Sequence, residues 1–391
     1  MKKLKNCQKP CRVWLKLVKP APHLPAFAPL AQRISDTVPF VGPEALERIR
    51  AKPFLARLGA NENGFGPSPQ VLKVLTAEAS LAWMYGDPEC YSLRLALALH
   101  LGTRAEHIVA GEGIDGLLGV LTRLFVGQGQ GVVTSAGAYP TFEFHVLAAG
   151  GILHKVPFLN DHEDPAALLA LAHQVRPKLL YLSNPNNPMG SVHHGARIEK
   201  MIEDLPQGTL LVLDEAYCEM ADKETIPQID PMDQRVIRLR TFSKAYGLAG
   251  LRVGYAIGHP QAIKGFERLR NHFGLGRLAQ AGALAALQDQ TYLHATLKNI
   301  AQARQTITQI AHDNGLVALA SATNFVTIDC GQDGGFAARV MSLLAQAGLF
   351  VRKPSIAPMD RCIRVSVGPK ADCDLLRAAL PGALAQARDG S

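Results

Sequence analysis

The sequence predicts an α/β fold with two unequal domains: a large one with a mostly parallel central sheet flanked by helices, and a smaller α+β domain at the C-terminal end. The chain has 391 residues, more than one ordinary hydrophobic core accommodates. Its middle alternates short apolar runs with segments of helical spacing, which is typical of a parallel sheet with helical crossovers. From about residue 288 onward this alternation gives way to longer helical stretches, which indicates the second domain.

The expected strands of the large domain are apolar runs of three to five residues. They are residues 132–134, 179–183, 210–214, 236–239 and 253–257. Helical spacing connects several of them, for example at 165–174 and 194–205. Because parallel sheets bind ligands at the carboxyl ends of their strands, polar residues that follow these runs are the candidates for function.

The smaller domain is expected to combine long helices with three strands. The helices are 292–314, 335–347 and 370–387, and the strands are 324–329, 349–352 and 362–367. We therefore predict a large domain at 66–288 and a small one at 289–391. Residues 36–65 are expected to pack with the small domain or a partner subunit, and residues 1–35 to form a flexible basic extension.

Composition narrows the possible partners. Hydrophobic residues make up 48% and charged residues 19%, which suits a compact globular protein. The net charge is +8, but much of the excess lies in the first 20 residues, with no basic run or aromatic platform elsewhere. This argues against nucleic-acid binding. No stretch is long and apolar enough to span a bilayer, so no membrane partner is expected.

The seven cysteines are scattered and odd in number, which favours free thiols in a reducing compartment. No metal is expected, because neither Cys7 with Cys11 nor His193 with His194 has further ligands at useful spacing. The N-terminus is basic but interrupted by prolines, and it lacks a clear signal-peptide pattern. The expected location is the cytoplasm.

The segment 241–252 carries a lysine directly after an expected strand. Lys244 would be partly desolvated there, which lowers the pKa of an amine and makes it nucleophilic. Thr241, Ser243 and Arg252 bracket it with hydroxyls and a guanidinium, a combination that suits a phosphate. The alternative is a surface lysine and arginine in a glycine-rich loop.

A second strand end carries Asp214 and, three residues later, Tyr217. A buried carboxylate needs a cationic partner, and a protonated ring nitrogen would serve. Tyr217 could then donate a hydrogen bond to a ring oxygen. The alternative for a lone aspartate at a strand end is a helix N-cap.

Three weaker signals follow other strands. The Asn-Pro turn at 183–190 could present an asparagine amide to a ligand, although most such segments are ordinary turns. The glycine loop at 111–116 precedes a helix over 117–125 and could offer backbone N–H groups to an anion. Tyr139 could stack on a planar ring or simply pack in the core.

Together these motifs resemble the class I/II aminotransferases of pyridoxal-phosphate fold type I. The pattern consists of NPNNPMG, DEAY and TFSKAYGLAGLRVGY in this order and spacing, and the similarity runs from about residue 61 to 364. Each motif is weak alone, but the joint pattern is specific. The resemblance implies a pyridoxal 5′-phosphate enzyme that moves an amino group between an amino donor and a 2-oxo acid, here 2-oxoglutarate.

Within that superfamily the chain is most similar to the histidinol-phosphate aminotransferases. The segments that carry this similarity are 59–69, 85–88 and 362–368. It implies histidinol phosphate, or an aromatic or other amino acid, as donor, and a place in histidine biosynthesis.

The resemblance also implies a role for each matching residue. Lys244 would carry the cofactor as a Schiff base and shuttle a proton, and Asp214 would pair with the pyridine nitrogen. Asn187 and Tyr217 would hold the ring oxygen, and Tyr139 would stack on the ring. The phosphate would be bound by the Ile114 and Asp115 amides, Thr241, Ser243 and Arg252.

The remaining implied roles concern the substrate and a partner subunit. Arg364 would hold the substrate carboxylate, Arg352 would touch the substrate phosphate, and Asn63 would line the entrance. Tyr85 would reach the phosphate of the partner's cofactor in a homodimer. Phe40 stands where the family usually has a tyrosine, and Met189 replaces its usual threonine, which leaves the donor open.

The same scaffold can host other reactions, since the fold alone does not decide which bond breaks. A decarboxylase similar to the threonine-phosphate decarboxylases, an oxygen-using oxidase and a non-catalytic cofactor-binding protein are the alternatives. Carbon dioxide release without a 2-oxo acid would favour the first, and oxygen consumption the second. Intact Lys244, Asp214 and Arg364 weigh against the third.

Overall fold

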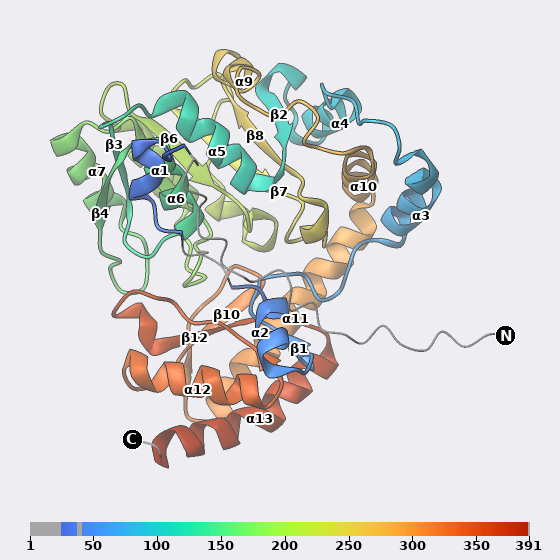
Figure 1. Cartoon of the computed structure of the whole chain (residues 1–391), viewed down its shortest axis with the longest axis vertical. Coiled ribbons are helices and arrows are strands. Elements are labelled where there is room, and N and C mark those ends of the chain that lie inside the picture. The colour runs from blue at the N-terminus through green and yellow to red at the C-terminus, as the bar shows by residue number, and fades with distance from the viewer. Residues whose placement is uncertain (1–24, 37–40, 390–391) are drawn as a thin grey trace. The chain divides into compact units, whose positions relative to one another are not determined.

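The computed structural model describes residues 25–36 and 41–389. The chain divides into two compact units, residues 1–37 and 38–391. The described part of the first unit contains the short helix α1 (Pro29–Arg33). Phe40, a predicted substrate contact, lies outside the described residues. All further description concerns the second unit, whose elements are labelled in Figure 1.

A seven-stranded sheet forms the centre of this unit, in the order β2-β8-β7-β6-β5-β3-β4. Its strands are β2 (Ile108–Gly111), β3 (Gly131–Ser135), β4 (Ile152–Val156), β5 (Leu179–Ser183), β6 (Leu210–Asp214), β7 (Val236–Thr241) and β8 (Gly254–Gly258). Only β8 runs antiparallel to its neighbours β2 and β7. The sheet is therefore mostly parallel, as predicted.

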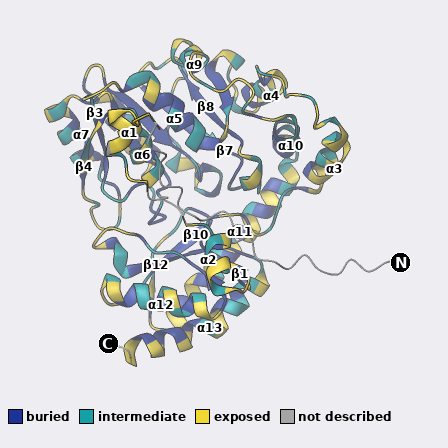
Figure 2. Ribbon diagram, in the orientation of Figure 1, coloured by how far each residue is buried: buried dark blue, intermediate teal, exposed yellow. Residues whose placement is uncertain are grey.

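Helices cover both faces of this sheet, which is why its central strands β5 and β6 are almost entirely apolar. Side chains of β5 alternate between two cores: Leu179 and Tyr181 face one, and Leu180 and Leu182 the other. The first core includes residues of α5 (Gly113–Phe125), α6 (Pro140–Ala148) and α9 (Pro260–Phe266). The second includes residues of α7 (Pro165–Val175) and α8 (Gly195–Glu203). Figure 2 shows the buried strands in dark blue between these helices.

Three more helices pack on one another next to β2: α4 (Tyr91–Leu101) contacts β2, α10 (Arg277–Gln288) contacts α4, and α3 (Pro69–Glu78) contacts α10. Short 3-10 turns complete the described part of the unit. They are η1 (Ala79–Leu81), η2 (Ala105–His107), η3 (Cys218–Met220), η4 (Lys223–Thr225), η5 (Ala249–Leu251) and η6 (Met359–Arg361).

The C-terminal part has a three-stranded antiparallel sheet, in which β10 (Phe325–Asp329) lies between β9 (Val317–Ala318) and β12 (Cys362–Ser366). Its helices are α11 (Gln290–Asp313), α12 (Gly334–Gln346) and α13 (Lys370–Asp389). The three helices, β10 and β12 follow the predicted ranges closely, whereas β9 was not predicted. The expected strand at 349–352 is shorter, because regular pairing is limited to β11 (Leu349–Phe350).

The segment before residue 66 joins this C-terminal part. Strand β1 (Ala56–Arg57) pairs in parallel with β11, and Figure 1 shows β1 and α2 (Pro43–Arg50) in blue among the orange and red elements. This pairing supports the predicted packing of 36–65 with a small domain, while the boundaries at 35, 65 and 288 stay predictions. Among the helices of the described residues, none has the length and apolarity needed to cross a bilayer.

Candidate active site

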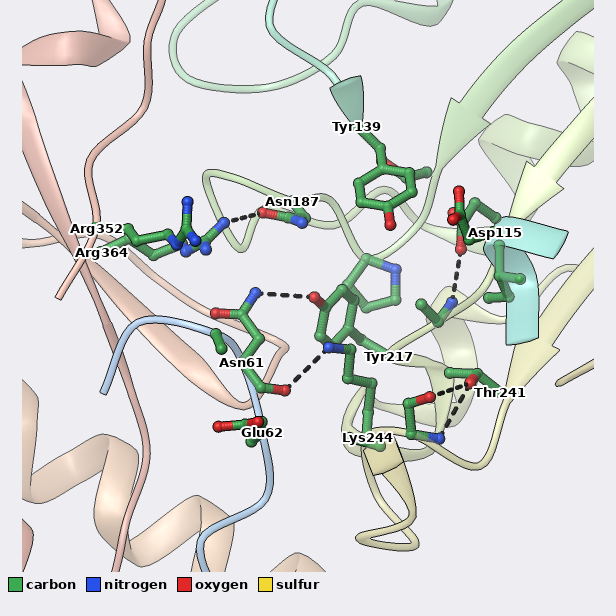
Figure 3. Close-up of a pocket in the computed structure, with 18 of the residues that line it drawn as sticks. Asn61, Glu62, Asp115, Tyr139, Asn187, Tyr217, Thr241, Lys244, Arg352 and Arg364 are labelled. Atoms are coloured by element: carbon green, nitrogen blue, oxygen red, sulfur yellow. Dashed lines mark hydrogen bonds between the residues drawn. The ribbon is translucent and has the colours of Figure 1, made fainter. Parts of the chain in front are cut away.

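A cavity of about 340 Å³ lies where the carboxyl ends of β5, β6 and β7 meet the C-terminal part. Most of the residues predicted from the sequence line it (Figure 3). They are Ile114, Asp115, Tyr139, Asn187, Asp214, Tyr217, Thr241, Ser243, Lys244, Arg252, Arg352 and Arg364. Segments far apart in sequence therefore form one site.

Lys244 follows β7 in a loop anchored by the fully buried Phe242. Its Nζ donates a hydrogen bond to the backbone oxygen of Asn61 at 3.0 Å. Burial, together with the nearby guanidiniums of Arg364 and Arg252, lowers the pKa of Lys244 to about 8. This amine is neutral far more often near pH 7 than an exposed lysine, so it can act as a nucleophile or a base.

Asp214 ends β6 and is buried. Its Oδ2 accepts from the Tyr181 hydroxyl at 2.7 Å, and its Oδ1 accepts from the Ala216 backbone N–H at 3.0 Å. Burial raises the pKa of Asp214 to about 6, although both hydrogen bonds favour the carboxylate. The hydrogen bond to Ala216 resembles the bond that an N-cap aspartate makes. No α-helix starts after Asp214, however, so helix capping does not explain why this acid is buried beside a cavity.

Tyr217 and Asn187 line the cavity from different elements and have different partners. The Tyr217 hydroxyl accepts a hydrogen bond from Asn61 Nδ2 at 3.0 Å, and burial raises the pKa of Tyr217. Asn187 Oδ1 accepts from Arg364 Nη1. Tyr139 extends into the cavity from the start of α6, and burial raises its pKa as well (Figure 3).

Thr241, Ser243 and Arg252 lie beside the start of α5. The Ser243 backbone N–H donates to Thr241 Oγ1 at 3.0 Å, and Arg252 Nη1 donates to Ser243 Oγ at 3.2 Å. A Cβ on Gly113 would lie 2.6 Å from Arg252 Nη2, so only glycine lets the guanidinium approach the first turn of α5 this closely. A cation, two hydroxyls and helix N-terminal amides fit a phosphate group.

The wall opposite the sheet is cationic. Arg364 Nη2 donates to the Gly59 backbone oxygen at 3.1 Å, and burial lowers the pKa of Arg364 to about 10. Arg352 lies beside it, because the backbones of the two arginines form a β-bridge. Arg352 Nη2 donates to the Val41 backbone oxygen at 2.6 Å. Two adjacent guanidiniums suit a carboxylate or a phosphate on a substrate.

Two predicted residues are not among those that line the cavity. Asn63 donates from Nδ2 to the Ala245 backbone oxygen at 3.0 Å, so it holds the loop of Lys244. Tyr85 is 77% exposed, and its ring packs on Phe273 with centroids 4.9 Å apart. The place of Asn63 at the entrance and the contact of Tyr85 with a second subunit stay predictions.

The sequence profile of the class I and II aminotransferases matches residues 55–380. The chain belongs to this family. A histidinol-phosphate aminotransferase from Sinorhizobium meliloti, whose crystal structure is described as a complex with pyridoxal-5′-phosphate, is 50% identical. It superposes with a TM-score of 0.89 over 92% of this chain and 98% of that one.

Curated relatives of this chain are also described as histidinol-phosphate aminotransferases. A histidinol-phosphate aminotransferase from Moorella thermoacetica is 32% identical over 356 residues, which is 90% of this chain and 91% of that protein. One from Mesorhizobium japonicum is 36% identical over 332 residues, 83% of this chain and 89% of that protein. The predicted fold class, family and aminotransferase activity are confirmed, and the predicted cofactor is the one named for the Sinorhizobium protein.

Sequence reasoning missed several residues of this aminotransferase site. Asn61, Glu62 and Tyr181 also line the cavity. Asn61 and Glu62 belong to the same segment as Asn63, so the right segment was chosen but not the right side chain. Tyr181 lies within an apolar run whose pattern predicts only a strand, although a buried tyrosine hydroxyl usually has a partner.

Glu163 was missed because nothing around it in the sequence indicates function. It is buried and accepts four hydrogen bonds: one from Ser135 Oγ, two from Ser183 and one from Asn186 Nδ2, at 2.7–3.1 Å. Ser183 and Asn186 begin the turn that presents Asn187. Glu163 therefore supports the shape of that turn from beneath.

Proposed function

We propose that this aminotransferase uses pyridoxal phosphate to move the amino group of histidinol phosphate to a 2-oxo acid, with 2-oxoglutarate as acceptor. The observation that carries the proposal is the common cavity of Lys244 and Asp214. It brings a lysine with a lowered pKa and a buried carboxylate together beside a phosphate-sized group of donors.

The cavity residues fit the cofactor at each of its polar groups. Asp214 would face the ring nitrogen, and Asn187 and Tyr217 the ring oxygen, with Tyr139 against the ring. Thr241, Ser243, Arg252 and the first amides of α5 at Ile114 and Asp115 would hold the phosphate. When bound, pyridoxal phosphate supplies an electron sink for the negative charge left on the donor's α-carbon.

Lys244 has the central part in proton transfer. Its amine would hold the cofactor and, when free, would take up the proton from the donor's α-carbon and pass it to the cofactor's aldehyde carbon, which lies two bonds away across the amine nitrogen. A base whose pKa is close to the working pH can both take and return a proton, and burial brings the pKa of Lys244 near that range. Asp214 keeps its negative charge best when a cation faces it, because burial alone disfavours the carboxylate.

Arg364 and Arg352 would bind the anionic ends of the two substrates. Arg364 would hold the carboxylate of the 2-oxo acid, and its bond to Asn187 connects that site to the cofactor side. Arg352 would hold the donor's phosphate. The names of the Sinorhizobium, Moorella and Mesorhizobium relatives support histidinol phosphate as the donor and a role in histidine biosynthesis.

The proposal includes a homodimer. Tyr85 packs on Phe273, and both rings are exposed, as is Trp83 two residues before Tyr85. Exposed aromatic clusters of this kind favour contact with another protein surface. The Tyr85 hydroxyl would then reach the phosphate of the partner subunit's cofactor. We also place the protein in the cytoplasm.

A panel of donors under single-turnover conditions tests this function. The holoenzyme is mixed with histidinol phosphate, phenylalanine, tyrosine, glutamate or aspartate, and cofactor absorbance is followed. Histidinol phosphate should convert the cofactor fastest, and 2-oxoglutarate should reverse the change. Faster conversion by an aromatic amino acid would contradict histidinol phosphate as the donor. No conversion by any donor would contradict transamination itself.

A further inference from the structure

Tyr181 reaches the carboxylate of Asp214 from the neighbouring strand. In the β5–β6 pairing Tyr181 lies opposite Val212 and Ser183 opposite Asp214, so Tyr181 and Asp214 are diagonal neighbours on the same sheet face. A long side chain can bridge such a diagonal. The hydroxyl donates to Asp214 Oδ2 at 2.7 Å, a short distance typical of a bond to a charged acceptor.

The position of the Tyr181 ring is set by packing. The residue is fully buried, and its ring stacks on Phe142 with centroids 4.4 Å apart and an interplanar angle of 18°. Tyr181 also borders the cavity that Asp214 lines. A phenylalanine would preserve this stacking and remove one hydrogen bond, so packing alone does not require a tyrosine here.

The surroundings of Asp214 explain what that bond does. Burial and two nearby carboxylates favour the neutral acid, while the Tyr181 and Ala216 hydrogen bonds and any facing cation favour the carboxylate. The titratable groups that face Asp214 are Tyr139, Glu163, Tyr181, Glu215, Tyr217 and Lys244. Lys244 is the cation among these groups, and its own pKa is lowered.

We propose that Tyr181 is a positioning residue that keeps Asp214 ionised and aimed at the ring nitrogen of pyridoxal phosphate. This inference rests on the proposed function and extends it to a residue that does not itself touch the reacting atoms. Without the hydroxyl, Asp214 would hold a proton up to higher pH and would then be unable to stabilise a protonated ring nitrogen.

The decisive experiment measures cofactor binding rather than turnover. Dissociation constants of the cofactor-free wild type and the Tyr181→Phe variant are determined by absorbance titration over a pH series. Two probes are used: pyridoxal phosphate and its 1-deaza analogue, in which carbon replaces the ring nitrogen. For pyridoxal phosphate, Tyr181→Phe should weaken binding roughly tenfold and move the acid limb of the pH profile up by about one unit.

The 1-deaza analogue distinguishes an effect of Tyr181 on the charge of Asp214 from a purely structural effect. Since it has no ring nitrogen for Asp214 to hold, its affinity should be the same in wild type and Tyr181→Phe. Tyr255→Phe is the matched control, because Tyr255 is equally buried but does not line the cavity, and it should leave both affinities unchanged.

Two outcomes would overturn the proposal. Equal weakening of both probes would make Tyr181 a structural residue only. An unchanged pH profile for pyridoxal phosphate would mean that the hydroxyl does not control the charge of Asp214. If the wild type bound neither probe, the proposed function itself would fail, which is a different and recognisable result.

Discussion

The two sides of the cavity are built in different ways. On the cofactor side, Asp214, Thr241 and Lys244 stand at or just after the ends of two adjacent strands, β6 and β7. On the substrate side, Arg364 lies on β12 and Arg352 just after β11, next to Asn61 of a segment about 290 residues earlier in the chain. The first arrangement follows from parallel pairing, whereas the second depends on long-range assembly.

The two sides also differ in how far apart in the sequence their hydrogen-bonded residues lie. The cofactor side has hydrogen bonds within short stretches of sequence, such as Thr241 with Ser243 and Ser243 with Arg252. The substrate side is held across the chain, as in Arg364 with Gly59 and Asn324 with Asn61. We therefore expect the cofactor side to be a rigid scaffold, and the substrate side to allow changes of specificity without loss of cofactor binding.

The largest effect is expected on the cofactor side, from Lys244→Ala. The first half-reaction should slow about 10⁴-fold, because the variant loses both the attachment point and the general base. Stopped-flow absorbance with histidinol phosphate measures this rate. Lys200→Ala, an exposed lysine on α8, is the control and should behave as wild type. A loss below tenfold in Lys244→Ala would refute the assigned base.

On the substrate side, Arg364→Ala should leave cofactor affinity nearly unchanged but lower kcat/KM for 2-oxoglutarate about 10³-fold, because a buried carboxylate would lose its cationic partner. Arg377→Ala, an exposed arginine paired with Asp374 on α13, serves as control. Steady-state kinetics and cofactor titration together give the answer. Equal losses in both measurements would break the distinction between the two sides.

The support beneath Asn187 can be tested through stability. Glu163→Leu should lower the free energy of unfolding by about 3 kcal/mol, since it leaves the buried donors of Ser135, Ser183 and Asn186 without an acceptor. Glu163→Gln keeps one oxygen acceptor and should lose much less. Urea unfolding followed by circular dichroism compares them, and equal losses would mean that hydrogen bonding at Glu163 does not matter.

The smallest effect concerns pH and the cofactor-free protein. Folding lowers the pKa of Lys244 from 10.5 to about 8, so between these values the folded state binds fewer protons than the unfolded chain. Its free energy of unfolding should therefore rise with pH across that window, by roughly 3 kcal/mol relative to Lys244→Met. Urea unfolding at several pH values measures this, and parallel curves would contradict the lowered pKa.

The cofactor side could be predicted from sequence because strand ends and turns are local features. Asp214 and Lys244 follow apolar runs, and parallel pairing makes such ends meet. Asn61 and Asn63 could not be told apart, since the positive φ of 54° at Asn61 turns the chain and sends the Asn63 side chain toward Ala245. That turn is fixed by tertiary contacts with Ser366 and Asn324.

Other features needed the register of the sheets. Tyr181 looked like core filling until its pairing beside β6 placed it diagonal to Asp214. Met189, noted only as a departure from the family pattern, packs in a buried cluster with Met359 and Cys362 of the C-terminal part. Neither contact is encoded in local spacing, so neither could be derived from the chain alone.

We propose that pyridoxal phosphate binds covalently at Lys244 with its ring nitrogen toward Asp214. The holoenzyme should be reduced with borohydride, digested and sequenced by mass spectrometry. The added phosphopyridoxyl mass should appear on the peptide containing Lys244 and should be absent from that peptide in Lys244→Ala. Stoichiometric label on another lysine, or no label on the wild type, would contradict it.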